Sequence, residues 1–320
     1  WMRIVLAILV WLVVSCMDVG VRRYIVTNKR LILRLGVFSR TVVDMPLNCI
    51  PATTSRAAAE TKKRVLAGKA FVNVGFWGGV VPGNAGELKA MREFGITGAK
   101  CFLCPSGVDE FPNVTRADLD LAMPVMKDLG LTLLVHAELP GPLEAAEKAV
   151  AGRDPRDYMT YLHSRPNAAE DEAITMLVEL VRKHGTRVHV VHLASGSAVP
   201  ILRKAQDEGL PISAETCLHY LTFCAEEIAA GATQFKCAPP IRDRANREQL
   251  WKGLQDGVLS CVVSDHSPCT TNLKKLDTGD FLGAWGGISS LQLGLPGLWT
   301  LAEARGLSLT DVYRWSAEAP

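Results

Sequence analysis

Short apolar runs alternate with amphipathic segments over most of the sequence, and this alternation restricts the chain to a small group of folds. Apolar runs of strand length that alternate with helical segments are typical of parallel βα units. Several of the runs are rich in valine. We expect strands at Thr41–Leu47, Ala70–Gly75, Gly98–Leu103, Leu131–His136, Arg187–Leu193, Ile212–Glu215 and Ser260–Ser264.

Helix start and stop signals lie between these runs. Asn84, Thr115 with Asp118, and Asn167 are typical of helix starts, because their side chains can accept hydrogen bonds from free backbone N–H groups. Glycines mark the matching ends, since glycine readily adopts positive φ. The sequence therefore predicts helices after Asn84, Thr115 and Asn167 that end near Gly95, Gly130 and Gly185, with others over Gly196–Gly209, Asn246–Gly257 and Ile288–Arg305.

Seven βα units fit an α/β fold of the (β/α)8 TIM-barrel type that lacks one strand, since a complete barrel takes roughly 250 residues. A doubly wound open sheet is the alternative, but no Gly-x-Gly-x-x-Gly follows an early strand. Residues 41–320 contain no linker-like tract and no internal repeat. We predict that they form one domain.

Residues 1–40 differ from the rest. Ile4–Val14 is an unbroken apolar run, shorter than the roughly 20 residues of a membrane-spanning helix. It could be the end of a longer spanning segment, with a signal peptide as the alternative. Arg22–Arg34 predicts two strands around a Thr-Asn-Lys turn and resembles the start of a bacterial pleckstrin-homology-like membrane domain. We therefore expect residues 1–40 to be a foreign or membrane-associated segment, with membrane contact through residues 1–20.

Composition excludes some functions. The net charge is +2 and 21% of residues are charged, which gives no basic bias for nucleic acid. The nine cysteines are scattered without a secretory framework, which favours a reducing cytoplasm. Cys101 and Cys104 form a C-x-x-C, but alternation along a strand would place them on opposite faces.

Four polar residues lie at or near the ends of successive apolar runs: Lys100, His136, His192 and Asp265. In a barrel these ends surround the active site, and imidazole and carboxylate are zinc ligands. A buried lysine loses its charge easily, and its amine can capture carbon dioxide to become a bridging carboxylate.

Each residue also has a simpler interpretation. Lys100 could extend its amine to solvent, His136 could be a hydrogen-bonded core histidine, and Asp265 could cap a loop. His189 shares the strand of His192 at an odd spacing, so we expect the two to face opposite ways.

The sequence from Val42 onward resembles the amidohydrolase superfamily and, within it, the cyclic-amide hydrolases. The motifs that carry the resemblance are KCFLCPSGVDEFP from Lys100, ETCLHYL from Glu215, KCAPPIR from Lys236 and SDHSPC from Ser264. They are most similar to allantoinases, ahead of dihydropyrimidinases (hydantoinases) and dihydroorotases.

The resemblance implies hydrolysis of a cyclic amide, allantoin to allantoate, in a cytoplasmic homotetramer. It implies two divalent ions, zinc, bridged by carbamylated Lys100, with His136 and His192 on one ion. Asp265 would be both a ligand and the proton shuttle for a metal-bridging hydroxide. The residues expected to contact the substrate through their backbone are Cys237, Ala238, Gly286 and Gly287. His219 and His266 are expected beside the site.

The family's metal site begins with a His-x-His motif, and none of the seven histidines here precedes His136. The family's first barrel strand and most of a companion β-sandwich are also missing from the resemblance. We therefore expect an incomplete barrel that keeps four of six ligands, in a fragment or chimera. Two function classes stay open: a cyclic amidohydrolase, and a non-catalytic binding or assembly module of the same fold.

Overall fold

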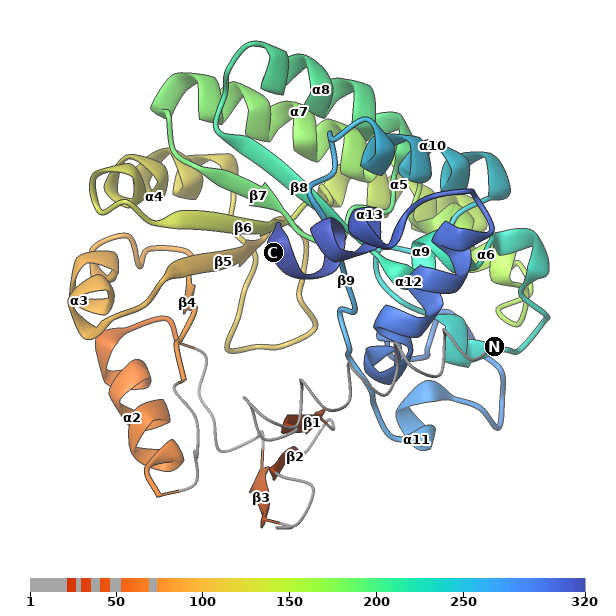
Figure 1. The fold of residues 1–320 in the computed structure, drawn as a ribbon, viewed down its shortest axis with the longest axis horizontal. Coiled ribbons are helices and arrows are strands. Elements are labelled where there is room, and N and C mark those ends of the chain that lie inside the picture. Colours follow the sequence, from red (N-terminus) through yellow and green to blue (C-terminus); the bar gives the residue numbers. More distant parts are fainter. Residues whose placement is uncertain (1–21, 27–29, 36–40, 47–52, 69–73, 320) are drawn as a thin grey trace.

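A six-stranded parallel sheet with helices packed on one face forms the body of the protein (Figure 1). The computed structural model describes residues 22–26, 30–35 and 41–46 as backbone strands, and residues 53–68 and 74–319 in full. The strands are β1 Arg22–Val26, β2 Arg30–Leu35, β3 Thr41–Pro46, β4 Gly78–Gly79, β5 Gly98–Phe102, β6 Thr132–His136, β7 Val188–Val190, β8 Ile212–Cys217 and β9 Cys261–Val263.

The α-helices of the described residues are α2 Arg56–Leu66, α3 Glu87–Phe94, α4 Arg116–Asp128, α5 Pro140–Val150, α6 Tyr158–Ser164, α7 Asn167–His184, α8 Val199–Asp207, α9 Leu218–Thr222, α10 Arg244–Gln255, α11 Thr271–Lys274, α12 Gly294–Glu303 and α13 Leu309–Tyr313. Short 3₁₀ turns are η2 Gly196–Ala198, η3 Ala225–Glu227, η4 Thr233–Phe235 and η5 Leu291–Leu293, and a π turn is η6 Arg314–Glu318. Every helix in the part of the chain described is too short or too polar to cross a lipid bilayer.

Strands β4 to β9 pair in chain order, and all of the pairs are parallel. Helices follow most of the strands, so the chain repeats the βα unit that the alternating pattern predicted. The predicted fold class, an incomplete (β/α) barrel, is confirmed. Within the described residues the sheet is open, with β4 at one edge and β9 at the other.

The predicted strand Thr41–Leu47 is not part of this sheet. β3 pairs antiparallel with β2, which pairs antiparallel with β1. The prediction of a parallel strand here was wrong because valine-rich alternation favours a strand without specifying its partner. The two strands predicted around the Thr-Asn-Lys turn are present. β2 and β3 pair across the boundary predicted at residue 40, and the division into domains stays a prediction.

The predicted strand Ala70–Gly75 falls largely on residues 69–73, which lie outside the described residues. The parallel sheet begins at Gly78–Gly79 instead. An added Cβ at Gly78 would lie 2.8 Å from the Ile96 side chain, and one at Gly79 would lie 2.6 Å from the Phe111 ring. Packing therefore favours glycines in β4, although glycine has low strand propensity. The segment 1–21, including the predicted membrane contact, also lies outside the described residues.

Helix ends largely follow the predicted signals. Thr115 and Asp118 form a reciprocal capping box at the start of α4, and Gly185 ends α7 with φ of 67°. α10 begins earlier than predicted, because Asp243 caps it and accepts a hydrogen bond from the Asn246 N–H. The Asn246 side chain bonds the loop after β7 instead.

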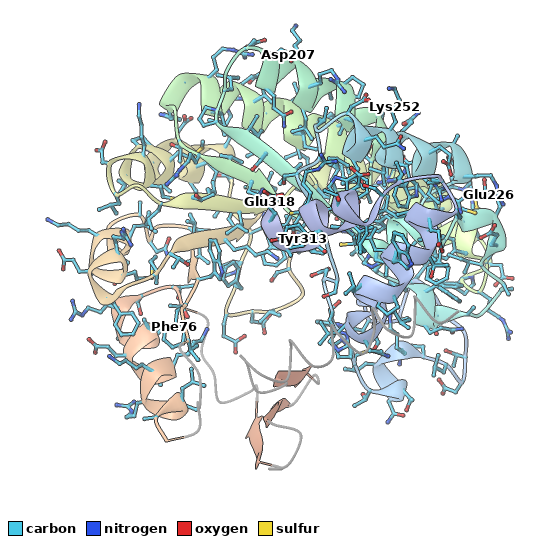
Figure 2. The ribbon with its side chains drawn as sticks, in the orientation of Figure 1. Phe76, Asp207, Glu226, Lys252, Tyr313 and Glu318 are labelled. Carbon is cyan, nitrogen blue, oxygen red and sulfur yellow. The ribbon has the colours of Figure 1, made fainter. Side chains whose placement is uncertain are left out.

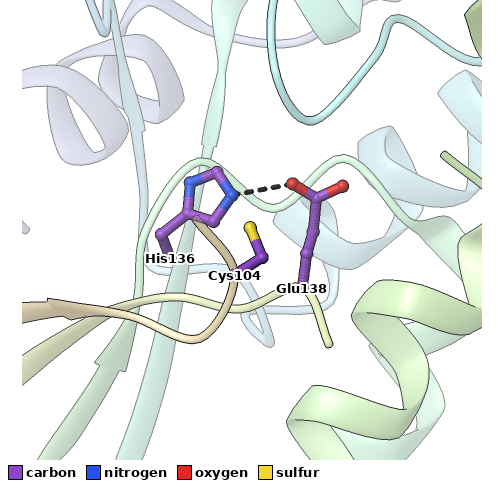
Figure 3. Close-up of side chains that lie close together, drawn as sticks. All are labelled: Cys104, His136 and Glu138. Atoms are coloured by element: carbon purple, nitrogen blue, oxygen red, sulfur yellow. Dashed lines mark hydrogen bonds and ion pairs between the residues drawn. The ribbon is translucent and has the colours of Figure 1, made fainter. Parts of the chain in front are cut away.

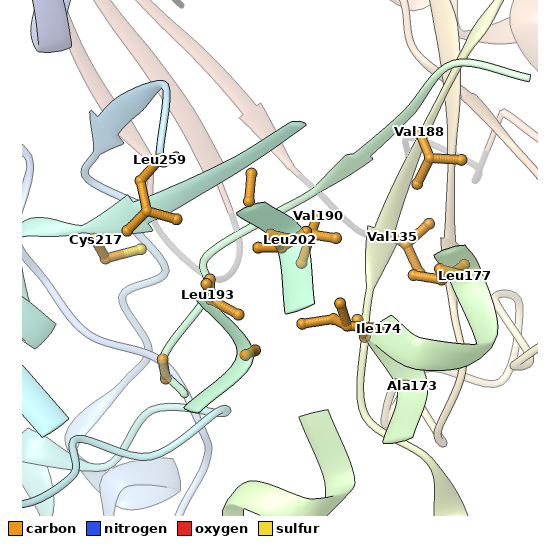
Figure 4. Close-up of a cluster of buried hydrophobic side chains, with 14 of the residues drawn as sticks. Val135, Ala173, Ile174, Leu177, Val188, Val190, Leu193, Leu202, Cys217 and Leu259 are labelled. Carbon is orange, nitrogen blue, oxygen red and sulfur yellow. The ribbon is translucent and has the colours of Figure 1, made fainter. Parts of the chain in front are cut away.

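The core lies between the sheet and its helices (Figure 4). Val135, Val188 and Val190 are buried on the helix side of β6 and β7, with Ile174 and Leu177 of α7 in the same cluster. Each fully buried side chain of this size contributes roughly 1.5–3 kcal/mol. Figure 2 shows Asp207 and Lys252 projecting into solvent from α8 and α10. The helices therefore cover the face of the sheet on which Val135, Val188 and Val190 lie.

The other face, here called the inner face, is polar and less buried. Strand alternation places Lys100, Leu134, His189, Ser213 and Glu215 on it, and all five are intermediate in exposure. Their paired positions form a row across the sheet, because Lys100 is in register with Leu134, Leu134 with His189, and His189 with Ser213. The candidate site lies at the carboxyl end of this face.

Candidate metal centre

The four residues predicted as ligands come from neighbouring strand ends. Lys100 is in β5, His136 ends β6, and His192 and Asp265 follow β7 and β9 by two residues. Lys100 is half-buried rather than buried, and its amine lies 4.7 Å from the centre of the Phe102 ring. Lys100 is therefore more exposed than the apolar run predicted.

The charges of these residues act on one another. Burial lowers the pKa of His136 and of His192, and the positive charge of Lys100 lowers both further. Burial raises the pKa of Asp265, whereas Lys100 and His136 oppose this shift. Such interactions require proximity. The structure thus brings the four predicted residues into one electrostatic group.

His136 and His192 are in direct contact. His136 Nδ1 lies 3.1 Å from His192 Nε2, and the two rings are 4.7 Å apart at 68°. Two nitrogens that bind one zinc ion at about 2.0–2.1 Å in tetrahedral geometry are about 3.3–3.4 Å apart. The two facing nitrogens therefore fit a shared cation. His192 Nδ1 is buried and has no hydrogen-bond partner among the described residues.

His192 and Asp265 have positive φ, 42° and 40° respectively. In the part of the chain that the structure describes, the only other non-glycine residue with positive φ is Lys275. Side-chain-bearing residues in this region cost of order 1–3 kcal/mol each and persist where the surroundings fix them. Two of the four predicted ligands thus lie at strained backbone positions just beyond their strands.

Buried Glu138 fixes the orientation of His136 (Figure 3). Its carboxylate accepts a hydrogen bond from His136 Nε2 at 2.7 Å and two from Arg165. Burial would raise the pKa of Glu138, but Arg165 and His136 outweigh it and hold the pKa far below its usual value. Because Nε2 is the donor, the proton of the neutral His136 ring is on Nε2. The lone pair of His136 Nδ1 therefore points toward His192.

Cys104 also lies beside this pair, and its thiol, His136 and Glu138 are close enough to hold a metal ion. Because burial raises the pKa of Cys104 to about 11, the thiol is protonated near neutral pH. The Glu138 carboxylate is already occupied by Arg165. The pair His136–His192 is therefore the better candidate for the cation.

A second buried ion pair supports the loop after His192. Glu170 accepts hydrogen bonds from the N–H groups of Ala194 and Ser195 at 2.9 and 3.1 Å. Its other oxygen accepts from Arg242 at 2.6 Å, and both side chains are 2% exposed. Arg242 also donates to the Arg165 carbonyl at 3.0 Å. These contacts join the loop that carries His192 to the segment that carries Arg165.

The four residues predicted to meet substrate lie on two adjacent segments. The Gly287 N–H donates to the Lys236 carbonyl at 3.0 Å, and an added Cβ at Gly286 would lie 3.4 Å from the Ala238 Cβ. The Cys237 carbonyl accepts from the Tyr161 hydroxyl at 2.6 Å. The Cys237 carbonyl therefore already accepts a hydrogen bond within the protein.

The other predicted histidines differ in their surroundings. His219 is 2% exposed, and neither ring nitrogen has a partner among the described residues. His266 Nδ1 accepts from the N–H groups of Ser290 and Leu291, so it anchors the loop before α12.

His189 and His192 were expected to face opposite ways, and this was wrong. His189 lies on the inner face, where it contacts Ser213 at 2.7 Å and Glu215 at 3.2 Å. β7 ends at Val190 and His192 has positive φ, so strict alternation does not extend to His192. His189, Glu215 and Cys261 form a second group close enough to hold a cation.

Sequence reasoning gave no role to Glu138, Arg165 or Arg242. Glu138 lies two residues beyond His136 beside an apolar run, and a buried carboxylate requires a partner. This position was the one sequence signal that could have indicated a role for Glu138. Its partner Arg165 is 27 residues away, a distance at which one sequence does not reveal pairing.

Comparison with known proteins identifies relatives of this chain. The chain is 49% identical over 275 residues to an allantoinase of Streptomyces avermitilis, covering 86% of this chain and 60% of that protein. It is 48% identical over 271 residues to a mitochondrial allantoinase of Aquarana catesbeiana, covering 85% and 55% respectively. The chain is a homologue of the allantoinases.

This allantoinase homologue also resembles solved hydantoinases. An L-hydantoinase (dihydropyrimidinase) from Arthrobacter aurescens superposes with a TM-score of 0.78 at 28% identity, over 84% of this chain and 60% of that one. A dihydropyrimidinase from Brevibacillus agri gives 0.72 at 26% identity, over 81% and 58%. No family model matches the sequence.

The homologue spans about 55–60% of the length of the allantoinases named above. The predicted likeness of residues 1–40 to a membrane domain finds no support in these comparisons. The predicted relationship to cyclic-amide hydrolases, with allantoinases foremost, is confirmed.

Proposed function

We propose that this chain hydrolyses a ring amide of allantoin, giving allantoate. The observation that carries the proposal is the contact between His136 Nδ1 and His192 Nε2, 3.1 Å apart beside Lys100 and Asp265. The identity of 41–49% to allantoinases over most of the chain supports this substrate.

Lys100, His136, His192 and Asp265 would hold two divalent ions, for which we propose zinc. Because Lys100 is half-buried rather than buried, we expect carbon dioxide to reach its amine. Capture forms an N–C bond and releases a proton, and the resulting carbamate oxygens could serve as ligands. A bound divalent ion would lower the pKa of water and polarise the amide carbonyl.

Asp265 would move the proton. Its position after β9 puts its carboxylate within the electrostatic reach of Lys100 and His136. It would accept a proton from the attacking water and return it to the departing ring nitrogen, as a general base that becomes a general acid. Glu138 would keep the Nδ1 of His136 free of a proton throughout.

Dihydropyrimidine or hydantoin rings are the second candidate substrates, because the solved structures reported above carry those names. Their identity to this chain, 26–28%, is well below that of the allantoinases. Allantoin is therefore the first substrate to test.

The proposal is tested by adding zinc and bicarbonate to the full chain and measuring ring opening of allantoin, hydantoin, dihydrouracil and dihydroorotate. We expect hydrolysis of allantoin above the others, abolished in Lys100→Ala and retained in Lys89→Ala, which alters an exposed lysine of α3. Absence of ring opening with every substrate would refute the proposed enzymatic activity. It would favour the alternative, a non-catalytic binding or assembly module.

Assembly and location complete the proposal. We expect a cytoplasmic homotetramer, with any membrane contact confined to residues 1–20. Light scattering would measure the assembly, and a monomer would contradict the tetramer. Cell fractionation would measure the location, and membrane binding that persists without residues 1–20 would contradict the expected location.

A further inference from the structure

Two lysines are buried behind the segments expected to meet substrate. Lys236 and Lys274 are each 8% exposed. Lysine is rarely buried to this degree unless it is paired. Here both amines donate to backbone carbonyls of one loop, residues 282–287, here called the 282–287 loop.

Lys236 binds the first half of this loop. Its amine donates to the carbonyls of Leu282 and Ala284 at 3.0 and 2.6 Å. It also lies 4.8 Å from the centre of the Tyr161 ring, whose hydroxyl donates to the Cys237 carbonyl. The side chain thus joins the loop to the segment on which Lys236 itself lies.

Lys274 binds the second half. Its amine donates to the Trp285 carbonyl at 3.0 Å and to the Lys236 carbonyl at 2.7 Å. The same Lys236 carbonyl accepts from the Gly287 N–H. One carbonyl of segment 236–238 therefore receives both a lysine amine and the loop backbone.

Retaining these charges has a cost. Burial, together with the charges of Arg165 and Lys274, lowers the pKa of Lys236 to about 8, and Asp280 opposes the shift. An apolar side chain would avoid this penalty. A residue kept in spite of such a cost calls for a role besides filling space.

We propose that Lys236 and Lys274 are positioning residues that hold the 282–287 loop against segment 236–238, and so set the spacing of the backbone groups that recognise a cyclic amide. This inference rests on the proposed function. A Cβ added at Gly286 would lie 3.4 Å from the Ala238 Cβ, so the two segments are close together at these two predicted substrate contacts. The lysines themselves do not touch substrate.

The first experiment measures loop order without activity. Hydrogen exchange of the full chain should be faster at Trp285 and Gly287 in Lys236→Met and Lys274→Met than in the unaltered protein. Lys275→Met, which alters the exposed neighbouring lysine, should leave exchange unchanged. Equal exchange in all three variants would overturn the proposal. Hydrogen exchange can be measured even if the chain opens no ring. A negative result here can therefore be distinguished from failure of the proposed function.

The second experiment separates recognition from chemistry. In the zinc-loaded chain, Lys236→Met should raise KM for allantoin about tenfold, the loss expected for a charged hydrogen bond. kcat and zinc content should stay within about threefold of the original. A fall in kcat together with lost zinc, at unchanged KM, would show a general structural role and overturn the proposal.

A cavity beside Lys236 allows chemical rescue. Tyr161, Arg165 and Lys236 line a cavity of about 300 Å³, with exposed Glu147 and Ala151 at its edge. Lys236→Ala removes the equivalent of n-propylammonium, which should enter the cavity and restore both slow exchange and low KM. 1-Propanol, of similar shape without charge, should not. Failure of the ammonium ion to restore slow exchange in the folded variant would contradict the proposal.

Discussion

His136 Nδ1 faces His192 Nε2 at 3.1 Å, while Glu138 accepts the hydrogen bond of the other His136 nitrogen at 2.7 Å. Two buried imidazoles in this arrangement have only one proton to share along the line that joins them. With the His192 proton on Nδ1, both facing nitrogens present lone pairs, and a cation between them would satisfy both. The carboxylate that fixes His136 is itself held by Arg165, so the orientation of the pair depends on residues that would not touch the metal.

Glu138→Gln should therefore weaken zinc binding. An amide can present its N–H₂ to His136 and so stabilise the wrong tautomer. Loss of such a supporting group typically reduces metal affinity about 10–100-fold. Competition with a fluorescent chelator measures the affinity. Glu144→Gln, at an exposed position of α5, is the matched control, and equal affinities of the two variants would refute the role of Glu138.

Arg242→Met should strongly destabilise the protein. The substitution leaves Glu170 buried without its charge partner, which typically costs about 3–5 kcal/mol. Urea unfolding measures the change in the free energy of unfolding. Arg244→Met breaks an exposed pair with Glu227, for which we expect no more than about 1 kcal/mol. Adding Glu170→Gln to Arg242→Met should recover part of the loss, and a further loss of stability would contradict this explanation.

Acid should destabilise the native state through His219. Burial lowers the pKa of His219 to about 3, against about 6.5 in an unfolded chain. Between these values the unfolded state binds more protons, so the free energy of unfolding falls as pH falls from about 6.5 toward 3. At pH 5 this group alone accounts for about 2 kcal/mol relative to pH 8.

His219→Leu removes that dependence. Urea unfolding at pH 8, 7, 6 and 5 should show a shallower loss of stability in this variant than in the unaltered protein. His163→Leu, at an exposed position of α6, should retain the original slope. Identical slopes for His219→Leu and the unaltered protein would show that His219 is not buried neutral.

The sequence predicted the strand ends well where an apolar run stops abruptly. Leu131–His136 was expected and Thr132–His136 is observed, because the run, the glycine before it and the polar residue after it all agree. Thr115 with Asp118 was equally clear, since both halves of a capping box lie within one turn. Local signals of this kind predicted the ends of strands and the starts of helices.

Pairing between distant segments was not predictable. Thr41–Leu47 has the composition of a barrel strand but pairs with β2, and β4 consists of two glycines. The contacts of Glu138 with Arg165, and of Lys236 with the 282–287 loop, join residues 27 to 48 positions apart. These contacts depend on the fold, so composition and spacing could not reveal them.

Zinc binding to the histidine pair tests the account most directly. The full chain, loaded with zinc in bicarbonate buffer, should show two imidazole ligands by X-ray absorption. His192→Ala should lose one imidazole and bind zinc at least about 100-fold more weakly, whereas His163→Ala should match the original protein. Zinc affinity and imidazole count that are unchanged in His192→Ala would contradict the central claim that His136 and His192 share one metal ion.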